Sequence, residues 1–300
     1  MLRAWTTARW SIPLPDGHRF PMAKYAMIRD GIVRLGLLPT DALHEPDPAS
    51  ADTLTLVHAP DYVDAVFQGG LDAAALRRLG FPWRSELAER SRRTVQGTIE
   101  AARDALAGGA GLNLAGGTHH AFPDHGEGFC VFNDVAVAIR LLQREGAIRR
   151  AAIVDLDVHQ GNGSAAIFDR DRDVTTFSMH GANNYPFRKE RSRLDVELAD
   201  GCDDAGYLTL LERHLDQVLT DPCPDLVVYI AGADPYAEDR LGRLRLSIGG
   251  LARRDRMVFT ACRRRSLPVA VVLGGGYARD LADVVTIHAN TARLLLETHG

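Results

Sequence analysis

Several features of secreted and membrane proteins are missing from this sequence of 300 residues. Its four cysteines are scattered and form no Cys-x-x-Cys pair, so we expect neither a disulfide framework nor a zinc–thiolate knuckle. The first 12 residues contain arginine and tryptophan but no apolar core of a signal peptide. No apolar run approaches the length that spans a bilayer. The sequence therefore predicts a cytoplasmic protein with reduced thiols and no membrane association.

The sequence also lacks an excess of positive charge, because its 35 lysines and arginines are outnumbered by 39 aspartates and glutamates, which gives a formal net charge of −4 at neutral pH. A chain of this charge has no overall field that would attract nucleic acid. One short segment, residues 181–193, is basic through Arg188, Lys189, Arg191 and Arg193. We interpret it as a solvated loop, and we expect no direct contact with nucleic acid.

Repeats, linkers and low-complexity tracts are absent, which favours one domain over residues 1–300. Helices are predicted over 22–37, 60–68, 71–79, 85–107, 133–145, 163–168, 204–219, 249–265 and 280–298. Strands are predicted over 54–58, 112–115, 151–158, 174–179, 226–231 and 269–273. Apolar strands that alternate with helices predict an α/β fold with a mostly parallel sheet and helices on both faces.

The most informative stretch runs from Ile153 to Gly163, where an apolar strand ends in polar residues and glycines. Side chains alternate along a strand, so Asp155, Asp157 and His159 should share one face. Burying two carboxylates and an imidazole together is costly unless something binds them. Aspartate oxygen and histidine nitrogen are ligands that suit zinc. The alternative is a capped strand end in which a carbonyl group satisfies His159.

Three further predicted strands also end in unusual residues, which are His119-His120, Asp234 and Gly274–Tyr277. Ligands of open parallel sheets bind at the carboxyl ends of the strands, so these sets should converge on one crevice. Asp157, His159 and Asp234 would supply three metal ligands and leave one position open, as in a catalytic zinc site. For Asp234 alone, a simple turn is the alternative.

Adjacent histidines, His119 and His120, are a second signal, because packing rarely needs such a pair. The ordinary pKa of histidine is near neutrality, so one of them could shuttle a proton. A carboxylate must orient such a histidine, and Asp155 is available on the strand with the metal ligands. Two exposed loop histidines are the alternative.

Tyr277 follows three glycines, which let backbone approach a ligand closely. A phenol at this place could donate a hydrogen bond to an oxyanion. The glycines do not form a phosphate-binding loop, because the lysine and the serine or threonine of that motif are missing.

Together these motifs resemble the zinc-dependent histone deacetylase family of the arginase/deacetylase superfamily. The resemblance rests on Gly116–Ala121, Gly128–Cys130, Asp155–Gly163, Gly232–Asp234 and Gly274–Tyr277. Gln160, Asn162 and the segment 238–242 are similar to the class IV branch of that family and its bacterial relatives. The resemblance implies a single-domain arginase/deacetylase-like fold, with a mainly parallel sheet of about eight strands.

The resemblance also implies an activity, which is the hydrolysis of an acyl amide on lysine or a similar amine. It implies Zn²⁺ on Asp157, His159 and Asp234. His120 would be the general base and acid. His119, held by Asp155, would be its electrostatic partner. Tyr277 would stabilise the oxyanion.

Two further sets of residues are implied in the same way. One is a K⁺ site, formed by Asp155, Ser178 and Met179 together with backbone of the zinc-binding stretch. The other set binds the acyl chain and comprises Gly128, Phe129, Tyr185 and Gly275. The acyl chain could be acetyl or longer, and the carrier could be a protein, a polyamine or another small amine.

One residue departs from the pattern of many relatives, which have aspartate where this chain has Asn162. The partner of His120 would then be neutral, and the pKa of His120 should be lower than beside a carboxylate. Two rival functions stay open, a two-manganese ureohydrolase and a catalytically silent acyl-lysine binding module. The oligomeric state cannot be deduced from these motifs.

Overall fold

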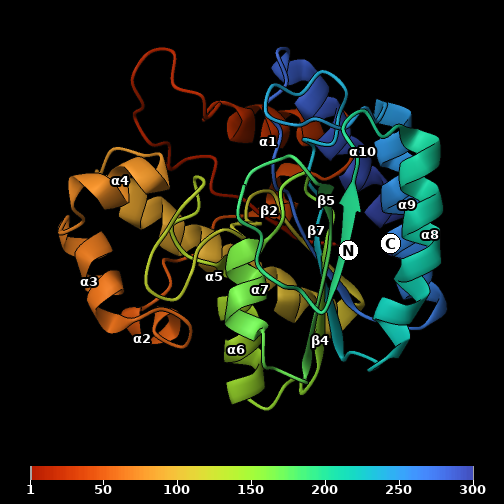
Figure 1. Ribbon diagram of the computed structural model, residues 1–300, viewed down its shortest axis with the longest axis horizontal. Helices are drawn as coiled ribbons and strands as arrows, with labels where there is room; N and C mark the ends of the chain where they lie inside the picture. Colours follow the sequence, from red (N-terminus) through yellow and green to blue (C-terminus); the bar gives the residue numbers. More distant parts are fainter. Residues whose placement is uncertain (1, 300) are drawn as a thin grey trace.

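A computed structural model describes residues 2–299, and its centre is one sheet in which all neighbouring strands are parallel. In this part of the chain the sheet has eight strands (Figure 1). In their order across the sheet they are β2 (Leu43–His44), β1 (Ala4–Trp5), β3 (Ala110–Asn113), β8 (Val269–Val272), β7 (Leu226–Ile230), β4 (Ala151–Asp155), β5 (Val174–Gly181) and β6 (Leu194–Leu198). The predicted α/β fold with a parallel sheet is confirmed.

The central strands are apolar because both faces of the sheet are covered. In β4, Ala152 and Val154 enter one hydrophobic core, whereas Ala151 and Ile153 enter another on the opposite face. Every residue of β4, β7 and β8 is buried, including Asp155 at the end of β4. Burial on both sides explains why these strands have apolar residues at successive positions instead of at every second one.

Two layers of helices cover the sheet, and a group of short helices lies beside them (Figure 1). Helices of one face pack in the larger core: α1 (Lys24–Arg34), α8 (Asp204–Thr220), α9 (Ile248–Arg264) and α10 (Leu281–His299). The other face is covered by α5 (Ser85–Gly108), α6 (Asp134–Arg144) and α7 (Asn162–Phe168). The short helices are α2 (Ala51–Leu54), α3 (Pro60–Gln68) and α4 (Ala73–Leu79), and Thr40–Ala42 form a 3₁₀ turn. None of the helices within residues 2–299 is long and apolar enough to cross a membrane.

Helix starts follow the expected capping chemistry. The side chain of Asn133 accepts a hydrogen bond from the backbone of Ala136 at the start of α6, as the sequence indicated. Asp203 caps α8 and Ser247 caps α9 in the same way. These caps fix where the helices begin after the loops at the carboxyl edge of the sheet.

One predicted strand is wrong, and two others end more than one residue earlier than predicted, at Asn113 instead of residue 115 and at Asp155 instead of residue 158. Residues 54–58 were expected to be extended, but α2 ends at Leu54 and the chain continues in turns. The backbone N–H of His58 donates to the carbonyl of Leu54, a helical spacing that the apolar alternation concealed. Strand β4 ends at Asp155 instead of residue 158. Strand alternation therefore does not orient Asp157 and His159.

The strand order determines where the motifs meet. The predicted site residues follow β3, β8, β7 and β4, which are consecutive neighbours in the sheet. Since parallel strands all end at the same edge, the loops after these four strands lie side by side. The segments that carry the motifs are far apart in sequence but share the centre of one edge.

Candidate functional site

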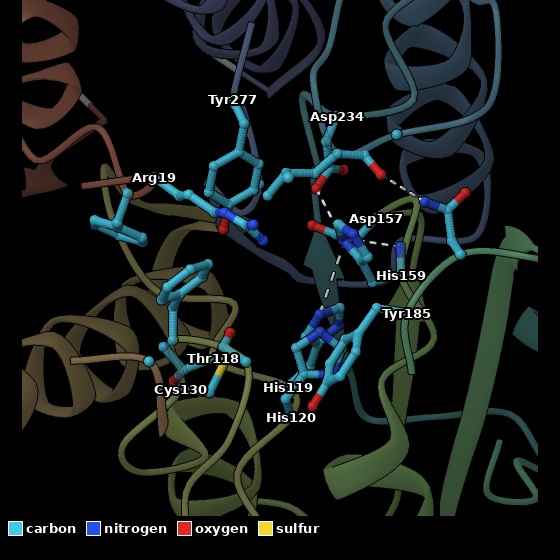
Figure 2. A pocket seen from close by; sticks show the side chains of 18 of the residues that line it. Arg19, Thr118, His119, His120, Cys130, Asp157, His159, Tyr185, Asp234 and Tyr277 are labelled. Atoms are coloured by element: carbon cyan, nitrogen blue, oxygen red, sulfur yellow. Dashed lines mark hydrogen bonds and ion pairs between the residues drawn. The ribbon is translucent and has the colours of Figure 1, made fainter. Parts of the chain in front are cut away.

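Three of the predicted ligands, Asp157, His159 and Asp234, are buried and converge after β4 and β7. One ligand atom from each lies within 4.8 Å of the others. His159 Nδ1 lies 3.0 Å from Asp157 Oδ1 and 3.2 Å from Asp234 Oδ2. Figure 2 shows the three side chains pointing toward one another. Asp234 Oδ2 is buried without a hydrogen-bond partner among residues 2–299, so this donor set fits a bound cation.

Asp157, His159 and Asp234 lie in loops after the strands, and local hydrogen bonds hold their side chains. Asp157 Oδ1 accepts from the backbone N–H of His159 at 2.9 Å. Asp234 Oδ1 accepts from the N–H of Val158 at 3.0 Å, which joins the loops after β4 and β7. Gly275 has a φ of +57°, and a Cβ there would collide with the Asp234 carboxylate. A glycine is therefore required beside this ligand.

Burial and the mutual interactions of the three side chains change the pKa values of the triad. Burial alone would lower the pKa of His159, but its hydrogen bond to Asp157 and the charges of the two carboxylates raise it to about 10. Burial and the charge of Asp157 raise the pKa of Asp234. For Asp157, contacts with His159 outweigh burial, and its pKa is lowered. Two carboxylates around one imidazole leave negative charge at the ligand atoms, and a divalent cation would neutralise it.

The histidine pair lies next to the triad, and each ring has a different partner. His119 Nδ1 lies 2.7 Å from Asp155 Oδ2, and the two imidazole rings are 4.2 Å apart between centroids. Burial would lower the pKa of His119, but the Asp155 carboxylate outweighs it and raises this pKa to about 9. The pKa of His120 is lowered by burial and then by the neighbouring imidazoles. His119 is thus the charged member and His120 the neutral one.

Glu127, which the sequence reasoning missed, fixes the proton position on His120. Asn162 Nδ2 donates to Glu127 Oε1 at 2.6 Å, because a carboxylate can only accept. This orients the amide so that Asn162 Oδ1 faces His120 Nδ1 at 2.7 Å. His120 must then donate from Nδ1, which leaves Nε2 unprotonated in the neutral ring. Nε2 is the nitrogen that can accept a proton.

We expect Asn162→Asp to move the acidic limb of the kcat/KM profile to higher pH. A negative charge beside His120 stabilises its protonated form and raises its pKa. The base is then protonated at a higher pH, so kcat/KM begins to fall at a higher pH on the acidic side of the profile. Two carboxylates at positions 127 and 162 would share a proton, which weakens this effect. The shift should therefore be larger in Asn162→Asp/Glu127→Gln, measured as kcat/KM against pH. Identical profiles in the wild type and both variants would contradict the role of this hydrogen-bond chain.

Tyr277 is held by groups from two other parts of the chain. Its backbone N–H donates to Asp239 Oδ2 at 2.6 Å. The buried ammonium of Lys24 lies 5.0 Å from the centre of the phenol ring and donates to the carbonyl of Gly275. Burial, followed by the carboxylates of the triad, raises the pKa of Tyr277, so the phenol stays protonated. A protonated phenol at this position can act as a hydrogen-bond donor.

The residues expected to bind an acyl chain line one cavity of about 790 Å³ together with the triad and the histidines. Tyr185 stands edge-on to His120 with 5.0 Å between ring centroids. Phe129 packs between Phe20 and Phe81, which fixes its ring. Gly128 approaches His120 so closely that a Cβ would lie 2.7 Å from the imidazole. Phe129 and Tyr185 thus add aromatic surface to a cavity that also contains the triad and the histidine pair.

The residues expected to hold K⁺ are also brought together. Asp155 and Ser178 are paired neighbours in strands β4 and β5, and Met179 follows in β5. Ser178 Oγ lies 2.9 Å from His180 Nδ1. A cation at this position stays a prediction.

Arg254 of α9 is a second group that the sequence reasoning missed. It is fully buried, and its Nη1 donates to the carbonyls of Leu156 at 3.1 Å and Gly232 at 2.7 Å. Each of these carbonyls lies within two residues of a metal-ligand candidate. Arg254 Nε donates to Asp255 at 2.9 Å, which balances the buried charge. In the sequence, the position of this arginine among the apolar residues of an amphipathic helix could have indicated that it is buried.

An open α/β sheet with a carboxylate–imidazole triad, a histidine pair and a phenol at one edge is typical of mononuclear metallohydrolases. The sequence model of the histone deacetylase domain matches residues 18–292. The chain belongs to the histone deacetylase family, which confirms the resemblance inferred from the motifs. Membership in this family supports a deacylase activity of hydrolase type and implies a metal cofactor.

Relatives and solved structures agree with this assignment. The chain is 47% identical over 277 residues to an uncharacterized protein of Picosynechococcus sp., covering 92% of each chain. It is 31% identical over 278 residues to histone deacetylase 2 of Arabidopsis thaliana, covering 89% of this chain and 72% of that one. The crystal structure of the HDA15 HD domain superimposes with a TM-score of 0.83 at 24% identity, covering 99% of this chain and 89% of that chain. This last likeness supports the fold.

Proposed function

We propose that this protein is a zinc-dependent amidohydrolase that removes acyl groups from lysine side chains or similar amines. The observation that carries the proposal is the convergence of the metal triad, the neutral His120 and the protonated Tyr277 on one cavity. An acyl amide needs three things for hydrolysis, which are an activated water, a proton donor for the amine and a stabilised oxyanion. The chain offers a group for each.

Asp157, His159 and Asp234 would hold the zinc ion. Zinc, when bound, is a Lewis acid that lowers the pKa of water and polarises a carbonyl. The unpartnered Asp234 Oδ2 and the excess of carboxylates support this assignment. Three protein ligands are the number found at catalytic zinc sites, which keep a position for water or substrate.

His120 would accept the proton of the attacking water at Nε2 and return it to the departing amine. His119 stays protonated against Asp155 and keeps the pKa of its neighbour low. Tyr277 would donate its hydroxyl proton in a hydrogen bond to the developing oxyanion. Phe129 and Tyr185 would flank the acyl group and the methylene chain of the lysine or other amine that carries it, and both residues line the cavity. K⁺ beside Asp155 and Ser178 would add positive charge near this site.

The two rival functions fit the site less well. A two-manganese ureohydrolase needs additional bridging carboxylates, but residues 2–299 contain one cluster of three candidate ligands. Pro235 and Tyr236 follow Asp234 where such a carboxylate would be needed. A silent acyl-lysine reader would not need a neutral base next to a phenol donor.

We expect metal removal to abolish hydrolysis and one equivalent of Zn²⁺ per chain to restore it. Removing the cation leaves two buried carboxylates in mutual repulsion, so the apo protein should also melt at a lower temperature. The assay should cover acetyl to long acyl groups on peptide, polyamine and small-amine carriers, with a hydroxamate inhibitor as control. Metal content is measured by mass spectrometry. Two catalytic Mn²⁺ per chain would favour the ureohydrolase, and a zinc-loaded protein inert toward every acyl amide would favour the reader.

A further inference from the structure

Five arginines from three distant segments surround the mouth of the cavity. Those that line it are Arg19, Arg77, Arg78, Arg240 and Arg243. All five are exposed, whereas the histidine pair and the triad below them are buried. Figure 2 shows Arg19 extending from its loop toward the interior of the cavity. The mouth is therefore basic, although the chain as a whole has a net charge of −4.

Most of this positive charge is not balanced within the protein. Arg243 pairs with Asp200 at 3.2 Å, and Arg240 Nε donates to the carbonyl of Tyr277 at 2.9 Å. The side chains of Arg19, Arg77 and Arg78 form neither ion pairs nor hydrogen bonds with residues 2–299. Unpaired arginines cost little in water, but they present free guanidinium donors at the point where a substrate must enter.

The lining of the cavity, as described for residues 2–299, contains no exposed acidic residue. Among the described residues that line the cavity, the acidic ones are Asp157 and Asp234, which are buried and belong to the metal triad. The remaining exposed members of the lining are Gly17, Asn183 and Phe187, which are uncharged. A substrate that enters the cavity therefore meets positive charge first.

We propose that the preferred substrates carry carboxylates close to the acylated amine, and that the arginines at the mouth bind them. This inference rests on the proposed deacylase function and specifies that its substrate is negatively charged. Guanidinium groups bind carboxylates through paired hydrogen bonds, and a basic mouth speeds the entry of anions. The same field repels cations, so acylated polyamines are disfavoured as substrates.

The test compares acetyl-lysine peptides of equal length, flanked by Asp and Glu, by Asn and Gln, or by Lys and Arg. We expect kcat/KM to be about tenfold higher for the acidic than for the basic peptide at low ionic strength. The difference should lie mainly in KM and should shrink as salt screens the arginines. Nα,Nε-diacetyl-lysine and its carboxamide form a second pair, which shows whether a small carboxylate amide is preferred as well. Acetylputrescine serves as the cationic small amine.

Arg19→Gln/Arg77→Gln/Arg78→Gln should reduce the difference between acidic and basic peptides to about twofold or less. In this variant kcat/KM should fall more for the acidic peptide than for the Asn/Gln peptide, because only the acidic peptide has carboxylates for the arginines to bind. Arg144→Gln/Arg172→Gln/Arg213→Gln is the matched control, because these three arginines are exposed, lie outside the lining of the cavity and carry the same total charge. Equal rates for all peptides, or a preference for the basic one, would overturn the inference. Failure to hydrolyse any acyl amide would instead overturn the proposed function.

Discussion

Replacing His120 by alanine is expected to lower kcat by about three orders of magnitude, within the range found for lost general acid–base catalysis. His120 is the neutral imidazole next to the metal triad, and its proton acceptor is fixed by Asn162 and Glu127. Without it, neither the water nor the leaving amine has a proton-transfer partner. Single-turnover rates on the best acyl substrate measure the loss.

Two comparisons make this result specific to His120. His119→Ala should cost less, because His119 acts through its charge and is held by Asp155. His214→Ala on α8 removes a histidine away from the cavity and should leave kcat unchanged. If His119→Ala were the more damaging variant, with Zn²⁺ still bound, the assignment of the base would have to be reversed.

Tyr277→Phe is expected to lower kcat by about 100-fold or more, as for the loss of one oxyanion donor. The phenol is kept protonated by burial and by the nearby carboxylates, so only its hydrogen bond is lost. The ring should stay in place, because Lys24 and the backbone of residues 275–277 hold it. KM should change much less than kcat, since the hydrogen bond strengthens only as charge develops.

Tyr236→Phe provides a control with the same atomic change. Tyr236 follows the proposed metal ligand Asp234 by two residues, and its hydroxyl donates to Asp283 at 3.1 Å outside the cavity. This variant should retain nearly full activity. Near wild-type turnover in Tyr277→Phe, measured with metal-replete protein, would exclude the oxyanion role of the phenol.

Much of the fold could be predicted because its central strands are continuous apolar runs that alternate with capped helices. Short elements could not be predicted. Strands β1 and β2 are two residues long each, so they carry too little pattern to distinguish them from loops. Residues 54–58 show strand-like alternation, but the backbone turns there because His58 is anchored to Phe122 and Asn133.

The candidate site was predictable where one short motif carries the chemistry. Asp155, Asp157 and His159 stand within five residues, and glycines mark the other loops. Glu127, Lys24 and Arg254 act through contacts with segments more than 30 residues away, which for Arg254 is the carbonyl of Leu156. Such contacts depend on the order of strands in the sheet, which a single sequence does not reveal.

Through Arg254, the packing of helix α9 would influence the geometry of the proposed metal site. Its guanidinium reaches from α9 to both peptide groups beside the triad, so a repacked α9 would displace two ligands together. Substitutions on this helix, remote from the cavity mouth, are therefore expected to weaken binding at the proposed metal site. A screen that measures only turnover would not distinguish such variants from substitutions of the site residues themselves, whereas a parallel measurement of bound metal would.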